Sequence, residues 1–334
     1  MRPFQRFVVE DPSQVGEARR AALALAGELA FDEACAGRLA LGVTELGTNL
    51  VRHAGGGALL LGADGTGVEL LSLDAGPGMD VERCLVDGFS TAGSAGTGLG
   101  AVRRMAQRFG AFSLPGRGAV IAARFEAATA AAGAPGAAGA AQGFSIAGLM
   151  LPAPGERVSG DGWGLRVRDG CTQLLMADGL GHGPQAAEAA ATMLDLSQRS
   201  AAGGPAALLE DAHPSLRSTR GAAVAVVALE RGPDRLVFAG AGNIAGRLVS
   251  GVVDRSLLSQ PGTLGLQIRR LQDTVHDWPE HALLVLHSDG IVSRWSLAEA
   301  EGLLRCDPMV VAGWIMRDHC RGRDDATVVV VRRH

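Results

Sequence analysis

The stretch AATAAAGAPGAAGAAQG, residues 127–143, decides how the rest of this 334-residue chain is organised. It consists almost entirely of Ala and Gly around a single Pro135, with no charge and no large apolar side chain. Such a segment buries too little apolar surface to offset the entropy cost of ordering it. The glycines and Pro135 would also interrupt an Ala-rich helix. The composition therefore predicts a flexible linker between two domains, 1–126 and 144–334.

Composition narrows the class of protein. The length is sufficient for about two domains, each with its own core. The net charge is -4 and aromatic residues make up only 4%, which argues against a basic, aromatic-rich surface for nucleic acid. Five scattered cysteines without a C-x-x-C pair are typical of reduced thiols. No apolar run approaches the ~20 residues that span a bilayer. We therefore expect a cytoplasmic protein with no membrane or nucleic-acid partner.

The chain contains no lysine, and all 31 of its basic residues are arginine. A Walker-A phosphate loop, a kinase of the eukaryotic type and Schiff-base chemistry each need a lysine. Composition excludes these three classes. Any nucleotide phosphate bound here has to be held by backbone amides, arginine and metal.

The first block carries three motifs. TELGTNLVRHA (44–54) lies in a helix expected over 31–54, which places Glu45 and Asn49 on one face, a turn apart. DAGPGM (74–79) follows a strand expected over 67–73, and the glycine-rich GTGLG (96–100) leads into a helix whose N-terminus would favour phosphate. An earlier helix is expected over 13–29, with Ser13 as its N-cap. Taken singly, the three motifs also fit a solvated helix face, an ordinary turn and a weak glycine fingerprint.

Together and in this order, ELGTN, DAGPGM and GTGLGAV resemble the N, G1 and G2 boxes of the GHKL (Bergerat-fold) ATPases, in particular the RsbT-type anti-sigma-factor kinases. The resemblance implies an α/β sandwich that binds ATP and Mg²⁺. Asn49 would coordinate Mg²⁺, Glu45 would polarise the attacking hydroxyl or water, and Asp74 would hold adenine. The other cofactor-binding positions that it implies are Gly76, Gly78, Gly96, Thr97, Gly98, Leu99 and Gly100. Gly47-Thr48 departs from the Ala-Arg of the RsbT type.

The second block reads as many β-strands with two helices, expected over 184–200 and 297–304. Aspartates recur where strands end, in the motifs SGDGW (Asp161), MADGLGHG (Asp178), HSDG (Asp289) and RDDATVVVV (Asp324 and Asp325). Carboxylates at strand ends can converge on one rim and form the all-oxygen site that Mg²⁺ and Mn²⁺ prefer. Two such ions can activate a water for attack on phosphorus. A single Asp-Gly pair, however, is also an ordinary turn.

These motifs, with AGAGNI (239–244) and GTLGL (262–266), resemble PP2C-like phosphatases of the SpoIIE/RsbU/RsbX type. The resemblance implies an α-β-β-α sandwich with two Mn²⁺ or Mg²⁺ ions at one end. The ligands that it implies are Asp161, Asp178, the Gly179 carbonyl, Asp289, Asp324 and Asp325. All of these aspartates except Asp325 would also be catalytic.

The two resemblances imply a two-domain α/β (α+β) protein that acts as a bifunctional switch in bacterial stress signalling. It would phosphorylate and dephosphorylate serine or threonine in STAS-domain regulators, with a downstream regulator or sigma-pathway protein as a further partner. Two alternatives stay open: a phosphatase regulated by an ATP-sensing GHKL domain, and a non-catalytic switch that binds a sigma or anti-sigma factor.

Overall fold

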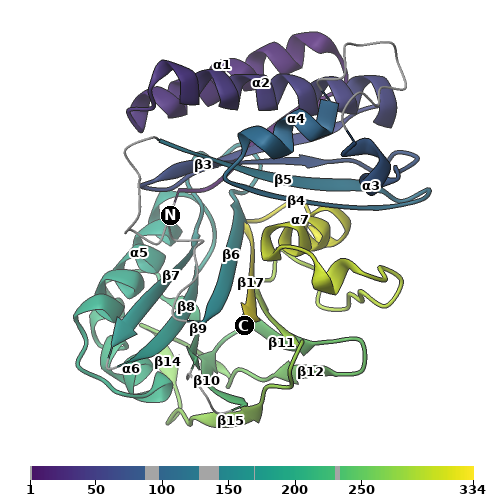
Figure 1. Ribbon diagram of the computed structural model, residues 1–334. Helices are drawn as coiled ribbons and strands as arrows, with labels where there is room; N and C mark the ends of the chain where they lie inside the picture. The colour runs from purple at the N-terminus through teal and green to yellow at the C-terminus, as the bar shows by residue number, and fades with distance from the viewer. Residues whose placement is uncertain (1, 87–97, 128–142, 169, 230–233) are drawn as a thin grey trace. The chain divides into compact units, whose positions relative to one another are not determined.

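The computed structural model describes residues 2–86, 98–127, 143–168, 170–229 and 234–334 (Figure 1). The chain packs into two compact units, each of mixed α/β structure. The first unit combines residues 2–136 with 299–317, and the second combines 137–298 with 318–334. The expected α/β fold with two domains is confirmed. The linker expected over 127–143 lies outside the described residues, except for its two ends.

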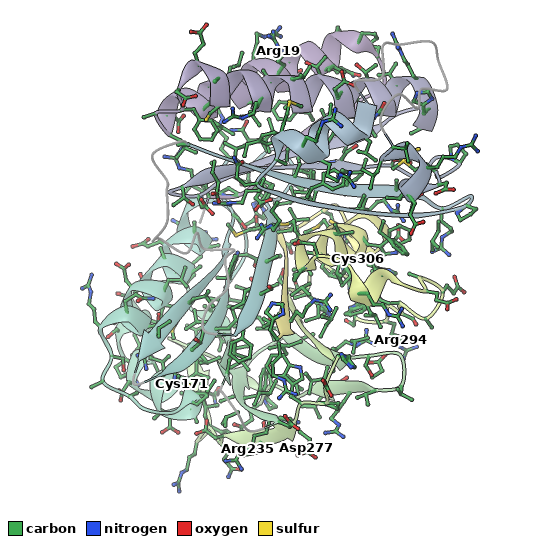
Figure 2. All side chains as sticks on the ribbon, viewed as in Figure 1. Arg19, Cys171, Arg235, Asp277, Arg294 and Cys306 are labelled. Carbon is green, nitrogen blue, oxygen red and sulfur yellow. The ribbon has the colours of Figure 1, made fainter. Side chains whose placement is uncertain are left out.

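The first unit is built on a five-stranded antiparallel sheet in the order β1-β2-β3-β5-β4. Its strands are β1 (Gln5–Val9), β2 (Gly57–Ala63), β3 (Gly67–Leu73), β4 (Arg108–Leu114) and β5 (Gly118–Glu126). Its N-terminal helices are α1 (Pro12–Glu28), α2 (Glu33–Asn49), η1 (Leu50–Ala54), α3 (Val81–Cys84) and α4 (Gly98–Met105). Helices α1, α2 and α4 cover one face of the sheet, and side chains fill the layer between them (Figures 1 and 2).

The opposite face of this sheet is covered by the segment 299–317, which contains η4 (Leu303–Arg305) and most of α7 (Pro308–His319). Side chains alternate between the two faces of a strand, so β5 turns Ile121 toward the helices and Val120 toward α7. A Cβ added to Gly313 of α7 would lie 2.9 Å from Val120, which shows how closely helix and sheet approach. Trp314 meets the ring of Phe112 edge to face, with centroids 5.0 Å apart.

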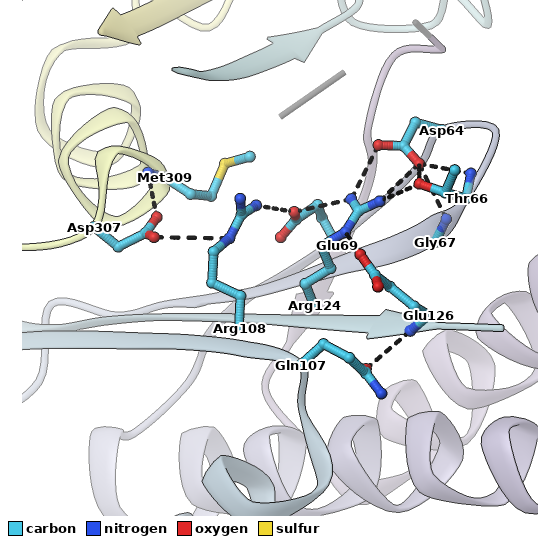
Figure 3. Close-up of polar contacts among 10 residues, drawn as sticks. All are labelled: Asp64, Thr66, Gly67, Glu69, Gln107, Arg108, Arg124, Glu126, Asp307 and Met309. Carbon is cyan, nitrogen blue, oxygen red and sulfur yellow. Dashed lines mark hydrogen bonds and ion pairs between the residues drawn. The ribbon is translucent and has the colours of Figure 1, made fainter. Parts of the chain in front are cut away.

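A buried charge network lies in the first unit (Figure 3). Arg124 on β5 is only 4% exposed, and its guanidinium donates to Asp64 at 2.9 Å and to Glu69 at 3.2 Å. Arg108 pairs with the same Glu69 and lies 3.7 Å from Asp307 in the 299–317 segment. Burial raises the pKa of Glu69, and the two arginines oppose that rise. Each buried charged side chain in this network therefore pairs with one of opposite charge. Without such a partner, a buried charge would destabilise the fold.

Three boundaries in the first unit differ from expectation. The N-cap of α1 is Asp11 and not Ser13: Asp11 Oδ1 accepts from Ser13 N at 2.8 Å, and Pro12 occupies the first turn, where its missing N–H is no loss. Helix α2 ends at Asn49, and the π-helical turn η1 follows, closed by Gly55 with φ 75°. Helix α4 spans Gly98–Met105, so it begins inside the glycine-rich motif that was expected to lead into it.

The second unit contains two five-stranded sheets, in the orders β15-β10-β9-β8-β7 and β12-β11-β16-β17-β6, and the pairings along both are antiparallel. The strands of the first sheet are β7 (Asp161–Arg168), β8 (Cys171–Gly179), β9 (Ala222–Leu229), β10 (Arg235–Ala241) and β15 (Thr274–Asp277). Those of the second are β6 (Phe144–Leu151), β11 (Ala245–Val249), β12 (Asp254–Leu257), β16 (Leu283–His287) and β17 (Ala326–Arg333). A short hairpin joins β13 (Gly262–Thr263) to β14 (Gln267–Ile268).

One continuous apolar core lies between the two sheets, with large side chains such as Trp163, Phe238 and Leu284. Helices α5 (Pro184–Arg199) and α6 (Pro205–Ala212) pack on the outer face of the β7-containing sheet, followed by η3 (Ser215–Ser218). The two sheets thus form the expected β-sandwich, and its strand ends carry the aspartate motifs.

The prediction of a helix over 297–304 is wrong. The structure has only the short η4 there, and Gly302, with φ 88°, precedes it at the N-cap position. Helices α6 and α7 have no counterpart among the expected elements. The sequence of α7 is apolar nearly all round and so lacks the one-sided pattern of a surface helix. Within the described residues, no helix has both the length and the apolar character needed to cross a membrane.

Candidate nucleotide and metal sites

A cavity of about 610 Å³ in the first unit is lined by residues from all three motifs of the first block. Helix α2 contributes Glu45 and Asn49, the loop after β3 contributes Asp74 and Gly78, and the first turn of α4 contributes Gly98 together with Leu99. The four-residue spacing of Glu45 and Asn49 is what lets both side chains reach one cavity. The structure therefore brings together residues that lie far apart in the sequence.

Asp74 is held firmly at the wall of this cavity. Its Oδ1 accepts hydrogen bonds from Gly76 N at 2.9 Å and from Ala119 N at 3.2 Å. Its main-chain carbonyl accepts from Arg317 Nη1 of α7 at 2.7 Å. Backbone amides thus fix one carboxylate oxygen, and the other can accept a hydrogen bond from an exocyclic amine.

Glycine is required around Asp74 for steric reasons. A Cβ on Gly78, where φ is 77°, would lie 2.3 Å from the carbonyl of Leu114, and one on Gly76 would lie 2.7 Å from Ala54 Cα. Both distances are far below a van der Waals contact, so the DAGPG sequence is needed to close the loop. Gly76 itself orients Asp74 through its N–H.

The end of the cavity formed by the glycine-rich motif is only partly described. Gly96 and Thr97 lie outside the described residues, whereas Gly98, Leu99 and Gly100 form the first turn of α4. Arg52 and Arg83 also line the cavity, as does His53 in the π-helical turn η1. Such turns are frequent at functional sites. The motifs alone did not identify the two arginines, although the absence of lysine predicted that arginine would help to hold any nucleotide phosphate.

In the second unit, Asp161 and Asp178 are direct partners in the register of β7 and β8. Asp289 follows β16, and Asp324 with Asp325 precedes β17, so each aspartate lies at the end of a strand. The pKa of Asp178 is raised to about 9, mainly by burial and then by the negative charges of the other four aspartates. The five carboxylates therefore lie close enough to repel one another.

Asp161 is 4% exposed, and burial raises its pKa to about 7. Its Oδ2 accepts from Ser288 Oγ at 2.7 Å, and Ser288 Oγ in turn accepts from Thr327 N at 3.0 Å. The other oxygen, Oδ1, is buried without a hydrogen-bond partner among the described residues. A buried carboxylate oxygen without a donor is costly unless a cation satisfies it.

Asp324 and Asp325 differ in their surroundings. Asp325 is 4% exposed, and its two oxygens accept from Ala153 N at 2.8 Å and Gly160 N at 2.9 Å. Asp324 is half-buried, and its Oδ1 accepts from Asp325 N at 2.9 Å. Asp325 thus ties the loop between β6 and β7 to β17, and Asp324 is the more accessible carboxylate of the pair.

The glycines beside the aspartates let backbones approach closely. A Cβ on Gly179 would lie 2.1 Å from the carbonyl of Ala186, and one on Gly290 would lie 2.0 Å from the carbonyl of Asp325. The Asp-Gly pairs are therefore more than turn signals, because neither glycine leaves room for a side chain.

Among the described residues, no three His, Cys, Asp or Glu side chains are arranged to hold a metal ion as they stand. The chemistry of the cluster nevertheless fits a hard divalent cation. It offers oxygen donors only, and one of them is orphaned. Burial, together with repulsion among the carboxylates, raises the pKa values of Asp161 and Asp178. A divalent cation would supply the missing partner and relieve the repulsion.

Two further residues near this rim were not identified from the sequence. Ser288 orients Asp161, and Asn243 Nδ2 donates to Asp289 Oδ2 at 2.8 Å. HSDG and AGAGNI contain these residues, but nothing in the motifs indicates what they contact.

The histidines of MADGLGHG and HSDG make contacts outside the group of aspartates. His182 is exposed, and its Nδ1 lies 2.9 Å from Glu156 Oε1. His287 is buried and accepts from Trp295 Nε1 at 3.0 Å. Both therefore pair with groups outside the aspartate cluster.

The fold and the two sites define a class: a histidine-kinase-like ATPase domain joined to a phosphatase domain of the PP2C type. Residues 8–125 match the family described as "Histidine kinase-like ATPase domain", and residues 168–334 match "Stage II sporulation protein E (SpoIIE)". The second match spans half of the chain, and the chain therefore belongs to the SpoIIE family. Both resemblances inferred from the motifs are confirmed.

Individual relatives agree with this assignment. The chain is 32% identical over 111 residues to the serine/threonine-protein kinase RsbT of Bacillus subtilis (strain 168), which covers 32% of this chain and 84% of RsbT. A chain from a structure of the bacterial stressosome, described as a modular system adapted to control secondary messenger signaling, is 29% identical with a TM-score of 0.52. That similarity covers 57% of this chain and 99% of the other.

Proposed function

We propose that this protein is a bifunctional switch: an ATP-dependent serine/threonine kinase in residues 1–126 and a metal-dependent phosphoserine/phosphothreonine phosphatase in 144–334, joined by the linker 127–143. The observation that carries the kinase half is the meeting of Glu45, Asn49 and Asp74 in one cavity of about 610 Å³. The RsbT relative, whose name describes a serine/threonine-protein kinase, supports serine or threonine as the phosphorylated residue. STAS-domain regulators as substrates follow from the resemblance to RsbT-type kinases. All five cysteines are among the described residues and none forms a disulfide, which supports a cytoplasmic location.

In the kinase half, Asp74 binds the adenine amine through its carboxylate, which the amides of Gly76 and Ala119 hold in place. Asn49 would hold Mg²⁺, which would supply positive charge to the ATP phosphates. Glu45, one turn earlier on α2, accepts the proton of the substrate hydroxyl. The start of α4 contributes backbone amides to the phosphates through Gly98, Leu99 and Gly100, together with Gly96 and Thr97.

In the phosphatase half, Mn²⁺ or Mg²⁺ would be held by Asp161, Asp178, the Gly179 carbonyl, Asp289 and Asp324, with Asp325 as a further carboxylate. Such a pair of bound ions would supply an activated water for attack on phosphorus. Ser288 keeps Asp161 in one orientation, and Asn243 does the same for Asp289. Exclusion of water around the buried Asp161 strengthens its interaction with a cation.

One contact favours a second candidate function, in which ATP regulates the phosphatase and the first domain transfers no phosphate. Arg317 of α7 donates to the Asp74 carbonyl, and α7 continues through His319 to the chain segment that carries Asp324. An occupied adenine site could thus be sensed by the segment that precedes β17.

Label transfer separates the two candidates. The full chain is incubated with γ-labelled ATP, Mg²⁺ and a STAS-domain partner, and then with Mn²⁺. The bifunctional switch predicts that the wild type adds and removes label, that Glu45→Ala only removes it, and that Asp178→Asn only adds it. Absence of transfer to any cognate STAS partner, with an ATP-sensitive phosphatase rate that survives Glu45→Ala, would favour the regulatory alternative.

A further inference from the structure

A second cavity, of about 690 Å³, lies in the second unit beside the aspartate rim. Its walls come from the segments 242–247, 256–259 and 293–296, and we call it the flanking groove. Asn243 belongs both to the groove and to the rim: it lines the cavity, and its Nδ2 donates to Asp289 Oδ2 at 2.8 Å. A chain whose phosphorylated residue sits at the rim therefore has the flanking groove next to it.

One wall of the flanking groove is held rigidly in place. The guanidinium of Arg247 stacks on the Trp295 ring at 3.9 Å and donates to the Trp295 carbonyl at 2.8 Å. The same guanidinium donates through Nε to Asp254 at 3.1 Å, and Trp295 Nε1 donates to the buried His287. A wall fixed in this way loses little conformational entropy when a ligand binds.

The open side of the groove presents chemistry that the fold itself does not use. Arg294 is exposed (Figure 2), and within the described residues its guanidinium makes no hydrogen bond or ion pair. Leu258 is 77% exposed and also lines the cavity. Arg247, in contrast, is already paired with Asp254. The groove therefore offers one uncommitted cation, one apolar side chain and the exposed hydroxyl of Ser293.

We propose that the flanking groove binds the polypeptide beside the phosphorylated residue, and that Arg294 selects substrates with an acidic side chain at that place. A guanidinium matches a carboxylate with two parallel hydrogen bonds, which gives direction as well as charge. An extended peptide advances about 3.3 Å per residue, so the selected side chain is a near neighbour of the phosphoserine. This proposal rests on the phosphatase function proposed above and adds a substrate class to it.

The test uses the full chain with Mn²⁺ and two kinds of substrate, p-nitrophenyl phosphate and phosphoserine peptides. The peptides carry Glu, Ala or Lys in turn at the two positions before the phosphoserine and at the two positions after it. p-Nitrophenyl phosphate has no flanking chain and serves as the internal reference. We expect the wild type to prefer Glu at one of these positions. We expect Arg294→Glu to lower the ratio of kcat/KM for that peptide to kcat/KM for the reference about five- to tenfold. Arg294→Lys should restore part of the ratio, and the Lys peptide should become the better substrate of Arg294→Glu.

The matched control is Arg199→Glu, which reverses an exposed arginine at the far end of α5, a helix about 24 Å long. It should leave the ratio as in the wild type. Equal rates on Glu, Ala and Lys peptides, or an equal loss on peptides and reference in Arg294→Glu, would overturn the groove proposal alone. Failure of the wild type to hydrolyse either kind of substrate would overturn the phosphatase function itself, and the groove proposal with it.

Discussion

Asp161 and Asp178 stand directly opposite each other on β7 and β8, so two carboxylates share one end of a strand pair. Like charges in directly opposed positions of a sheet are destabilising. Burial and the neighbouring aspartates raise the pKa of Asp161 to about 7 and that of Asp178 to about 9, against an ordinary value of 3.8. The fold therefore retains a repulsion that a bound cation would remove.

This arrangement predicts that the metal-free protein loses stability between pH 7 and pH 9. In that range the folded chain binds more protons than the unfolded chain, because Asp178 ionises at a higher pH in the folded state. The free energy of unfolding then falls with rising pH, by up to about 1.4 kcal/mol per pH unit for one such group. Urea unfolding in EDTA at several pH values measures the slope.

The matched variant is Asp178→Asn, which should flatten that slope because the amide does not titrate. Added Mn²⁺ should stabilise the wild type more at pH 9 than at pH 7, since its ligands are then ionised. A free energy of unfolding that rises with pH in EDTA would contradict the interpretation.

Ser288→Ala removes the hydroxyl that donates to the buried Asp161 Oδ2. The lost hydrogen bond favours the protonated carboxyl, so we expect the pKa of Asp161 to rise further. Stability should fall by about 1–3 kcal/mol, because a buried acceptor loses its donor. The acidic limb of the kcat/KM profile against pH should move to higher pH, and phosphatase assays over a pH series measure the shift.

The control for this variant is Ser250→Ala, in the turn between β11 and β12. Ser250 Oγ accepts from nearby turn amides, such as Val253 N at 2.9 Å, and none of these belongs to the aspartate rim. Ser250→Ala should therefore leave the pH profile in place. An identical profile for Ser288→Ala and the wild type would show that Ser288 does not orient Asp161.

Much of this site could be predicted from the sequence, because strand ends and Asp-Gly pairs are local signals. The contacts of Ser288 and Asn243 could not, since each joins segments that are distant in the chain. The same limit applies to α7. All of its residues from Pro308 to Met316 are buried, so its sequence shows no helical period. The stretch 297–304 has good helix formers but is interrupted at Gly302 by a left-handed conformation.

Gly290→Ala tests the close approach of backbones at the aspartate rim. The added Cβ would lie 2.0 Å from the Asp325 carbonyl, so the strand ends would have to move apart. We expect a loss of stability of about 1–3 kcal/mol and a large fall in phosphatase activity. Gly251→Ala, where a Cβ meets nothing within 4 Å, is the matched control. Thermal unfolding of both variants measures the difference, and equal melting temperatures would refute the steric argument.

Arg317→Ala should weaken ATP binding although Arg317 is not expected to touch the nucleotide. The variant removes the 2.7 Å hydrogen bond to the Asp74 carbonyl and the stacking of Arg317 on Trp314 at 3.7 Å. One such hydrogen bond corresponds to about 0.5–1.5 kcal/mol, or roughly a two- to tenfold rise in Kd. Titration with a fluorescent ATP analogue measures it, with the exposed Arg305→Ala as the control. An unaltered affinity of Arg317→Ala for the ATP analogue would show that the contact from α7 does not affect nucleotide binding.

Arg124→Ala should destabilise the first unit severely. It leaves the buried Asp64 without its arginine and leaves Glu69 with Arg108 alone, and a buried unpaired charge costs about 3–5 kcal/mol. Arg2→Ala removes an exposed pair with Glu28 and should cost less than about 1 kcal/mol. Urea unfolding compares the two, and similar losses would mean that the buried network contributes no more than a surface pair.

The packing of 299–317 against the sheet of the first unit also bears on how the chain is made. The ribosome synthesises residues 2–136 first. It reaches the segment 299–317, which packs on their sheet, only after the whole of 137–298 has been synthesised. At roughly 5–20 residues per second that interval is on the order of ten seconds. Until then the face that holds Phe112 and Val120 has no α7 to cover it. The first unit therefore reaches its final form only after residues 299–317 have also left the ribosome.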